Sequence, residues 1–176
     1  EEAGYFIAGV LAHIKGITAF ANPLVNSYKR LTGGKEAPRH ITWGFGNHSS
    51  LIRIPPLIDS YFRFELRSPD PTCNPYLTFA LILEAGLEGI EKKLPLMDES
   101  DLDEDEILKD SQKYKNIEEL PITLIEAIDA MKSDALIKRV LGENLANNYI
   151  ELKTLEWMDY IKTVHPWEID RYLSTY

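Results

Sequence analysis

The chain has 176 residues, enough for one ordinary domain with a sizeable core, and its 44% hydrophobic content argues against a disordered protein. Its net charge of −9 argues against a nucleic-acid partner. No apolar run approaches the roughly 18 residues that cross a membrane, and no signal peptide opens the chain. The single cysteine, Cys73, cannot form an internal disulfide, which fits a cytoplasmic protein, and we interpret it as structural.

Apolar residues repeat at helical spacing near the start and predict a helix over residues 3–19. His13 lies on this helix, where a lone histidine is more often packed or capping than catalytic. The next segment, residues 22–38, is broken by prolines and a double glycine and is expected to be irregular. Long ordered loops in compact domains are usually functional. After the double glycine, Glu36 could swing over a ligand, or it could be a surface acid beside a tight turn.

Three short strands are expected next, near residues 39–45, 50–54 and 61–67, and together they favour an antiparallel sheet. The segment 29–67, which contains them, carries seven basic and three acidic side chains, although the whole chain is acidic. A locally positive segment in an acidic protein indicates a small anionic ligand, such as a phosphate or a carboxylate.

The third strand, YFRFELR, places a carboxylate between two guanidinium groups. Side chains alternate along a strand, so Arg63, Glu65 and Arg67 are expected to share one face. Arg53 of the second strand is available to the same face if the register permits it. The simplest interpretation is a ladder of surface salt bridges of little energetic value. The alternative is a site that binds a metal ion through Glu65 and anions through the arginines.

The rest of the chain is predicted to be mainly helical. One helix is expected to begin at Pro75, with Asn74 as its N-cap, and to run to about residue 93. An acidic segment, residues 97–118, is interpreted as a solvated linker, because it lacks the glycine and the spaced glutamate of a calcium-binding loop. Further helices are expected over residues 122–131, 133–140 and 142–163, and a short helix is expected in the final segment, HPWEIDRYLSTY. None of these later helices carries a chemical motif.

Three sequence blocks occur in a specific order: NPLVNSYKRLTGGKEAP, then NHSSLIRIP after a tryptophan, then RFELRSPDPTCNPY. In order, spacing and identity they resemble the C-terminal half of the catalytic domain of glutamine synthetase. The final segment, HPWEIDRYLSTY, resembles the end of the bacterial and archaeal class I enzymes. The resemblance covers essentially all of residues 1–176. It implies an α+β fold, in which antiparallel active-site strands pack with several helices.

The resemblance also implies an activity. Enzymes of this family ligate ammonia to the side-chain carboxylate of L-glutamate, using ATP, through a γ-glutamyl phosphate. The implied metal cofactor is Mg²⁺ or Mn²⁺, and ATP is a co-substrate. The implied enzyme is cytoplasmic, has no nucleic-acid or membrane partner, and forms a homo-oligomer, a double-ringed dodecamer.

The matched positions carry expected roles for five charged residues. By resemblance, Arg30 and Arg67 bind the glutamate substrate. Arg53 and Arg63 contact the phosphates of ATP, and Arg53 also counts among the catalytic residues. Glu65 ligates the metal ion. This assignment fits the charge pattern of the third strand, because guanidinium groups beside Glu65 favour its ionised form.

Two further positions complete the expected site. Glu36 is implied to be the flap acid that closes over glutamate and helps to deprotonate ammonium. His48 stands where the family normally has arginine, and it is expected to contact ATP at the transferring phosphoryl group with fewer donors and a shorter reach. This departure leaves two alternatives open: a ligase of the same family that uses an amine or polyamine, and a catalytically weak regulatory or structural paralogue.

The glycine-rich ATP signature of the family, most of its metal ligands and its small N-terminal β-rich domain lie before the matched region. We therefore expect residues 1–176 to be the C-terminal portion of the catalytic domain of a longer synthetase. Alone, this chain is expected to bind MgATP poorly and to have no activity.

Overall fold

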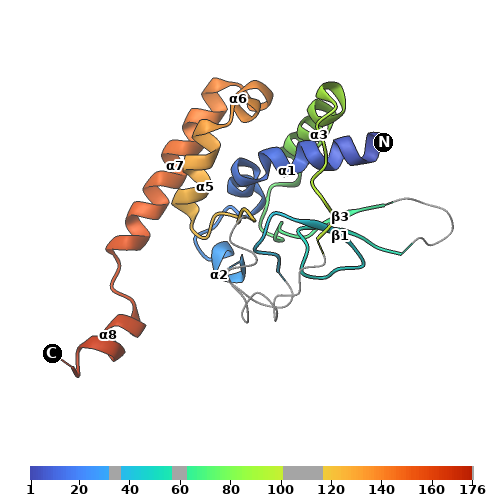
Figure 1. The fold of residues 1–176 in the computed structure, drawn as a ribbon. Helices are drawn as coiled ribbons and strands as arrows, with labels where there is room; N and C mark the ends of the chain where they lie inside the picture. Colours follow the sequence, from blue (N-terminus) through green and yellow to red (C-terminus); the bar gives the residue numbers. More distant parts are fainter. Residues whose placement is uncertain (32–36, 57–62, 101–116, 176) are drawn as a thin grey trace.

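Two long helices form the centre of the computed structural model, which describes residues 1–31, 37–56, 63–100 and 117–175. They are α1 (Glu2–Ala21) and α3 (Pro75–Lys92), and they pack closely against each other (Figure 1). Glycines permit this close approach. A Cβ atom added to Gly9 would lie 2.1 Å from the carbonyl oxygen of Ala85 and 2.8 Å from the Cα atom of Gly89. Backbone therefore meets backbone at this crossing, without intervening side chains.

The start of α3 confirms the predicted N-cap. The side chain of Asn74 accepts hydrogen bonds from the backbone N–H groups of Tyr76 and Leu77, and Pro75 occupies the first helical position. The helix ends at Lys93, which adopts the left-handed conformation with φ 49°. The predicted boundaries of this helix are thus correct to within one residue.

The helices of the C-terminal half confirm the predicted ones. Their bounds are α5 (Leu124–Ser133), α6 (Ala135–Leu141), α7 (Glu143–Lys162) and α8 (Pro166–Tyr172). Of these, α5 and α6 pack against the first pair, while α7 packs on α5 and α6. The hydroxyl of Tyr149, on α7, donates to the carbonyl oxygen of Ala19 at 2.7 Å, and its ring stacks on Phe20 at 4.2 Å between centroids. Beyond this contact, the end of α7 and all of α8 extend away from the rest of the molecule (Figure 1).

One short helix corrects the expectation that residues 22–38 are wholly irregular. The helix α2 (Ser27–Leu31) forms within this segment, with Tyr28 and Leu31 buried in the core. Its two buried apolar side chains explain why one helical turn forms there, although the flanking prolines and glycines suggested otherwise. Residues 32–36 lie outside the described part of the chain.

The sheet is small and mixed. Its strands β1 (Trp43–Phe45), β2 (Ile52–Ile54) and β3 (Glu65–Leu66) lie in the order β1-β2-β3. The expected antiparallel pairing occurs between β2 and β3, but β1 and β2 are parallel. The connection between β1 and β2 explains the difference. Gly46 has φ 63°, and the side chain of Asn47 accepts from the N–H of Ser49 at 2.8 Å, so the chain doubles back before β2 begins.

Both described ends of the acidic segment 97–118 attach to the region of β1. The N–H of Ser100 donates to the carbonyl oxygen of Trp43 at 3.0 Å, and the indole N–H of Trp43 donates to that of Met97 at 2.8 Å. At the other end, the N–H of Ile41 donates to the carbonyl oxygen of Glu118 at 2.8 Å. Residues 101–116 lie outside the described part, so the linker interpretation stays a prediction.

The hydrophobic core gathers along α1. Twelve of its residues are buried, and side chains from the sheet and from α5, α6 and α7 pack around it. Contrary to the prediction from sequence, α1 is long and apolar enough to meet the length and composition of a membrane-spanning helix. However, most of this apolar stretch is buried inside the protein, which is the pattern of a core helix. The architecture, mostly helical with one small sheet, agrees with the predicted α+β class.

Candidate functional site

The pairing of β2 with β3 sets which side chains share a face. Arg53 lies directly opposite Glu65, and Ile52 lies opposite Leu66. Directly opposed residues of antiparallel strands point to the same side of the sheet. Ile52 is fully buried, so its face meets the core, while Arg53 and Glu65 share the opposite face. The register that the sequence left open thus places these two charges together.

A glutamate lies between two arginines on this face. Arg53 Nη1 donates to Glu65 Oε1 at 2.9 Å, and Arg67 Nε lies 3.6 Å from the same oxygen. The two guanidinium groups are largely buried, whereas 43% of the Glu65 side chain is exposed. The prediction that Glu65 and Arg67 lie together is therefore confirmed, and the register adds Arg53 to them, whereas Arg63 lies outside β3. The ligands assigned to them stay predictions.

Arg30 joins this cluster through the backbone that follows Arg67. Arg30 lies on α2 and is exposed, and its Nη2 atom donates to the carbonyl oxygens of Ser68 and, at 3.1 Å, Pro69. Burial alone would raise the pKa of the nearby Asp70, but hydrogen bonds from Ser27 and Thr72, together with the charge of Arg30, lower it. Asp70 is therefore an ionised neighbour of Arg30 near neutral pH.

Two of the predicted residues are not part of this contact network. Arg63 and His48 are exposed, and within the described residues neither makes a hydrogen bond or an ion pair. His48 lies in the connection between β1 and β2. Glu36 lies outside the described residues, so its predicted role as a flap acid has no structural account.

The geometry favours binding of anions beside a cation. Two guanidinium groups held in place by burial offer forked donors to carboxylates and phosphates. An exposed carboxylate between them offers oxygen to a hard divalent cation. Among the described residues, no group of three or more His, Cys, Asp and Glu side chains could hold a metal ion. Glu65 therefore fits as one metal ligand, and the described residues do not form a complete metal site.

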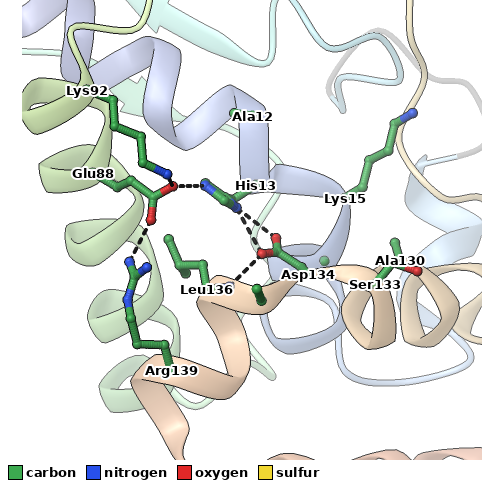
Figure 2. Close-up of a pocket in the computed structure, with 12 residues that line it drawn as sticks. Ala12, His13, Lys15, Glu88, Lys92, Ala130, Ser133, Asp134, Leu136 and Arg139 are labelled. Atoms are coloured by element: carbon green, nitrogen blue, oxygen red, sulfur yellow. Dashed lines mark hydrogen bonds and ion pairs between the residues drawn. The ribbon is translucent and has the colours of Figure 1, made fainter.

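A second charged cluster lies where α1, α3 and α6 meet, and sequence reasoning did not predict it. Figure 2 shows His13 between Glu88 and Asp134. His13 Nδ1 lies 2.9 Å from an oxygen of Asp134, and His13 Nε2 lies 3.4 Å from Glu88. Asp134 also caps α6, since it accepts from the N–H of Leu136 at 3.0 Å. The interpretation of His13 as a packed residue is therefore correct, but its partners are too distant in sequence to be identified from spacing.

This second cluster is a saturated ionic network beside a cavity of about 530 Å³. The carboxylate of Glu88 accepts hydrogen bonds from Lys92 Nζ at 2.5 Å and from Arg139 Nη2 at 2.6 Å. These bonds lower the pKa of Glu88 to about 2. The hydrogen bond to Asp134 raises the pKa of His13, despite the opposing effect of burial. Each acid already has its own cations, so the cluster serves to join helices.

Comparison with known proteins gives a consistent result. A family model described as the glutamine synthetase catalytic domain matches residues 1–172. The glutamine synthetase of Methanosarcina mazei is 48% identical over 174 residues, which are 99% of this chain and 39% of that protein. The glutamine synthetase of Thermus thermophilus is 48% identical over 178 residues, covering 100% of this chain and 40% of that protein.

Solved structures give the same picture for the fold. A structure described as a GmaS/ADP complex superposes with a TM-score of 0.83 at 35% identity, covering 98% of this chain and 40% of that one. GmaS without ligand gives a TM-score of 0.81 at 37% identity, covering 98% and 38%. The chain therefore spans about two fifths of the length of the proteins that it matches.

Proposed function

The chain belongs to the glutamine synthetase catalytic-domain family, and from that premise we propose that the protein joins ammonia to the side-chain carboxylate of L-glutamate, using ATP. Glutamate is first phosphorylated to γ-glutamyl phosphate, and ammonia then displaces the phosphate. The observation that carries the proposal is the exposed carboxylate of Glu65 between the buried guanidinium groups of Arg53 and Arg67.

Phosphoryl transfer is catalysed mainly by positioning and by neutralisation of charge. We assign contacts with the ATP phosphates to Arg53 and Arg63, and a weaker contact to His48. Glu65 supplies one oxygen ligand to Mg²⁺ or Mn²⁺. When bound, the metal ion would neutralise phosphate charge, and its other ligands come from outside the described residues.

Glutamate binding is assigned to Arg30 and Arg67. Arg30 is exposed and already donates to carbonyl oxygens, so a carboxylate of the substrate can replace these acceptors. Arg67 lies at the same corner, directly before Ser68. Glu36 is assigned the closing of the site and the deprotonation of ammonium, by resemblance alone.

Ammonia is proposed as the acceptor because relatives that are 42–48% identical to this chain are named glutamine synthetase. A ligase that uses an organic amine is the second candidate. The histidine at position 48, where the family normally has arginine, is the feature that keeps it in consideration.

We also propose a cytoplasmic homo-oligomer, with a dodecamer as the expected form. The single cysteine, Cys73, is free, which is common in a reducing compartment. The arm formed by α7 and α8 supports an oligomer, because large apolar side chains are exposed along it: Leu152, Leu155, Ile161, Val164, Trp167 and Leu173. Analytical ultracentrifugation of the native protein tests this proposal, and a monomer would contradict it.

The function is tested by measuring phosphate release from MgATP in the presence of glutamate. Both the native protein from its source and the 176-residue chain are assayed, with ammonium or methylamine as the acceptor. We expect the native protein to require glutamate and to prefer ammonium, and the 176-residue chain to be inactive. A preference for methylamine would favour the second candidate. The absence of glutamate-dependent release from the native protein would overturn both.

A further inference from the structure

We propose that Asn22 is a positioning residue for the two arginines assigned to glutamate, Arg30 and Arg67, and that it acts by holding the carbonyl group of Ser68. The inference rests on the proposed function, because it concerns the same site. Asn22 itself is fully buried, so it does not contact a substrate.

Asn22 ends α1 and points its side chain toward the chain that follows β3. Its backbone N–H donates to the carbonyl oxygen of Thr18 at 2.8 Å, and its φ and ψ of −136° and 69° leave the helical region. The residue before a proline is disfavoured in helical conformation, and Pro23 follows directly. Its side-chain amide then donates to the carbonyl oxygen of Ser68 at 2.8 Å.

Residues 68–70 are thereby fixed to the end of α1. Besides the amide of Asn22, the N–H of Asp70 donates to the carbonyl oxygen of Ala21 at 3.0 Å. On the other side, the N–H of Arg67 donates to the carbonyl oxygen of Leu51 at 2.9 Å. Arg67 is therefore held on both sides: its own N–H bonds to Leu51, and the carbonyl group of the next residue, Ser68, bonds to Asn22 at the end of α1. A change at either bond moves the base of its side chain.

The same carbonyl group explains how Arg30 can engage a substrate. The carbonyl oxygen of Ser68 accepts from both Asn22 and Arg30, and Ser68 is fully buried. A buried carbonyl without a donor is unfavourable, because it has lost its hydrogen bonds to water and gained none in return. If Arg30 turns to a substrate carboxylate, Asn22 remains as the donor, so this cost is not incurred. Without Asn22, Arg30 would be held back on Ser68.

The test is the steady-state kinetics of the native-length protein with Asn22→Ala. We expect the KM for glutamate to rise about tenfold, while kcat and the KM for MgATP change less than about twofold. The matched control is Thr78→Val. Thr78 is also buried and donates to the carbonyl oxygen of Phe20 at 3.4 Å, so it links the same end of α1 to α3 and not to Ser68. We expect this control to lower thermal stability and to leave the KM for glutamate unchanged.

A glutamate KM that is unchanged in Asn22→Ala, or raised equally in Thr78→Val, would overturn the proposal. If Asn22→Ala does not fold, Asn22→Ser replaces it, because its shorter hydroxyl does not reach Ser68 but fills more of the space. The same kinetic shift is expected for that variant.

A second measurement separates this inference from the proposed function. Amide hydrogen exchange is followed at Arg67 and Asp70, whose N–H groups are bonded on either side of Ser68. We expect at least tenfold faster exchange at Asp70 in the Asn22 variant than in Thr78→Val. If exchange is faster but the native protein has no glutamate-dependent activity, Asn22 holds Ser68 as proposed and the proposed function is wrong. Equal exchange in the two variants would show that Asn22 does not hold Ser68 in place.

Discussion

Two charged clusters in the described part of the chain are opposite in construction. In the strand cluster, the acid is exposed and its cations are buried: 43% of the Glu65 side chain is accessible, against 19% for Arg53 and 12% for Arg67. In the helix cluster, the acid is buried and its cations are exposed: 9% of the Glu88 side chain is accessible, against 56% for Lys92 and for Arg139.

The opposite burial of acids and cations indicates a binding role for the strand cluster and a structural role for the helix cluster. A buried acid needs its cations to offset the loss of hydration, so removing it harms the fold. Buried guanidinium groups around an exposed acid have fixed positions before a ligand arrives, so little reorganisation is needed on binding. The predictions below change the helical region and the strand region separately.

The largest expected effect is on the helical region. In Gly9→Ala, the new Cβ would meet the backbone of Ala85 and Gly89, which cannot rotate away. We expect the free energy of unfolding to fall by about 3 kcal/mol, at the upper end of overpacking costs. Urea denaturation measures this change. The matched control is Gly4→Ala on the same helix, where the nearest atom to the new Cβ is 3.8 Å away. This control should be neutral or slightly stabilising, and an equal loss in both variants would contradict the prediction.

The strand cluster should respond in function and not in stability. We expect Glu65→Gln to lower glutamate-dependent turnover of the native protein by about 100-fold, because a charged ligand to the cation is lost. Its unfolding free energy should change by less than about 1 kcal/mol. Glu119→Gln is the control, because Glu119 is 41% exposed and pairs with Arg39 at the same 2.9 Å. Equal turnover in the two variants would remove Glu65 from the site.

Glu88→Gln should give the converse result. Lys92, Arg139 and His13 would all face a neutral amide in place of a buried carboxylate. We expect a loss of about 2 kcal/mol in unfolding free energy, with the KM values of the folded enzyme unchanged. Thermal unfolding and steady-state kinetics on the same preparation measure both quantities. A changed KM at full stability would mean that the helix cluster belongs to the active site.

The smallest effect is a pH dependence. The folded protein raises the pKa of His13, chiefly through the hydrogen bond to Asp134, so charged His13 contributes stability below about pH 6.5. This contribution is lost as the pH rises through the raised pKa. The free energy of unfolding of the wild type relative to His13→Asn should therefore be larger at pH 6 than at pH 8.5, by under about 1 kcal/mol, and Tm measured at the two pH values follows this trend.

His40 supplies the control of opposite sign. Burial lowers its pKa, against the opposing charge of Glu119, so the folded state disfavours its protonation. The stability of the wild type relative to His40→Asn should fall as the pH is lowered. The same trend for both histidines would show that their Tm differences do not report these two environments.

The sequence predicted the features that depend on local spacing. Alternation in YFRFELR placed Glu65 with Arg67, and the Asn74–Pro75 pair marked the start of α3. It did not predict contacts made through backbone groups. The partner of Arg30 is the carbonyl group of Ser68, which has no side-chain signature. The parallel pairing of β1 with β2 also escaped prediction, because the four residues expected between these strands normally form a hairpin.

The hydrogen bonds at Ser100 and Glu118 also have a use in protein engineering. Both anchors end on one short stretch of chain, at Trp43 and Ile41, so the number of residues between them does not set the position of β1. Doubling the length of a flexible insert between fixed ends costs only about 0.6 kcal/mol. A fluorescent reporter or an affinity tag inserted between the anchors is therefore expected to leave the bonds of Ser100 to Trp43 and of Ile41 to Glu118 in place.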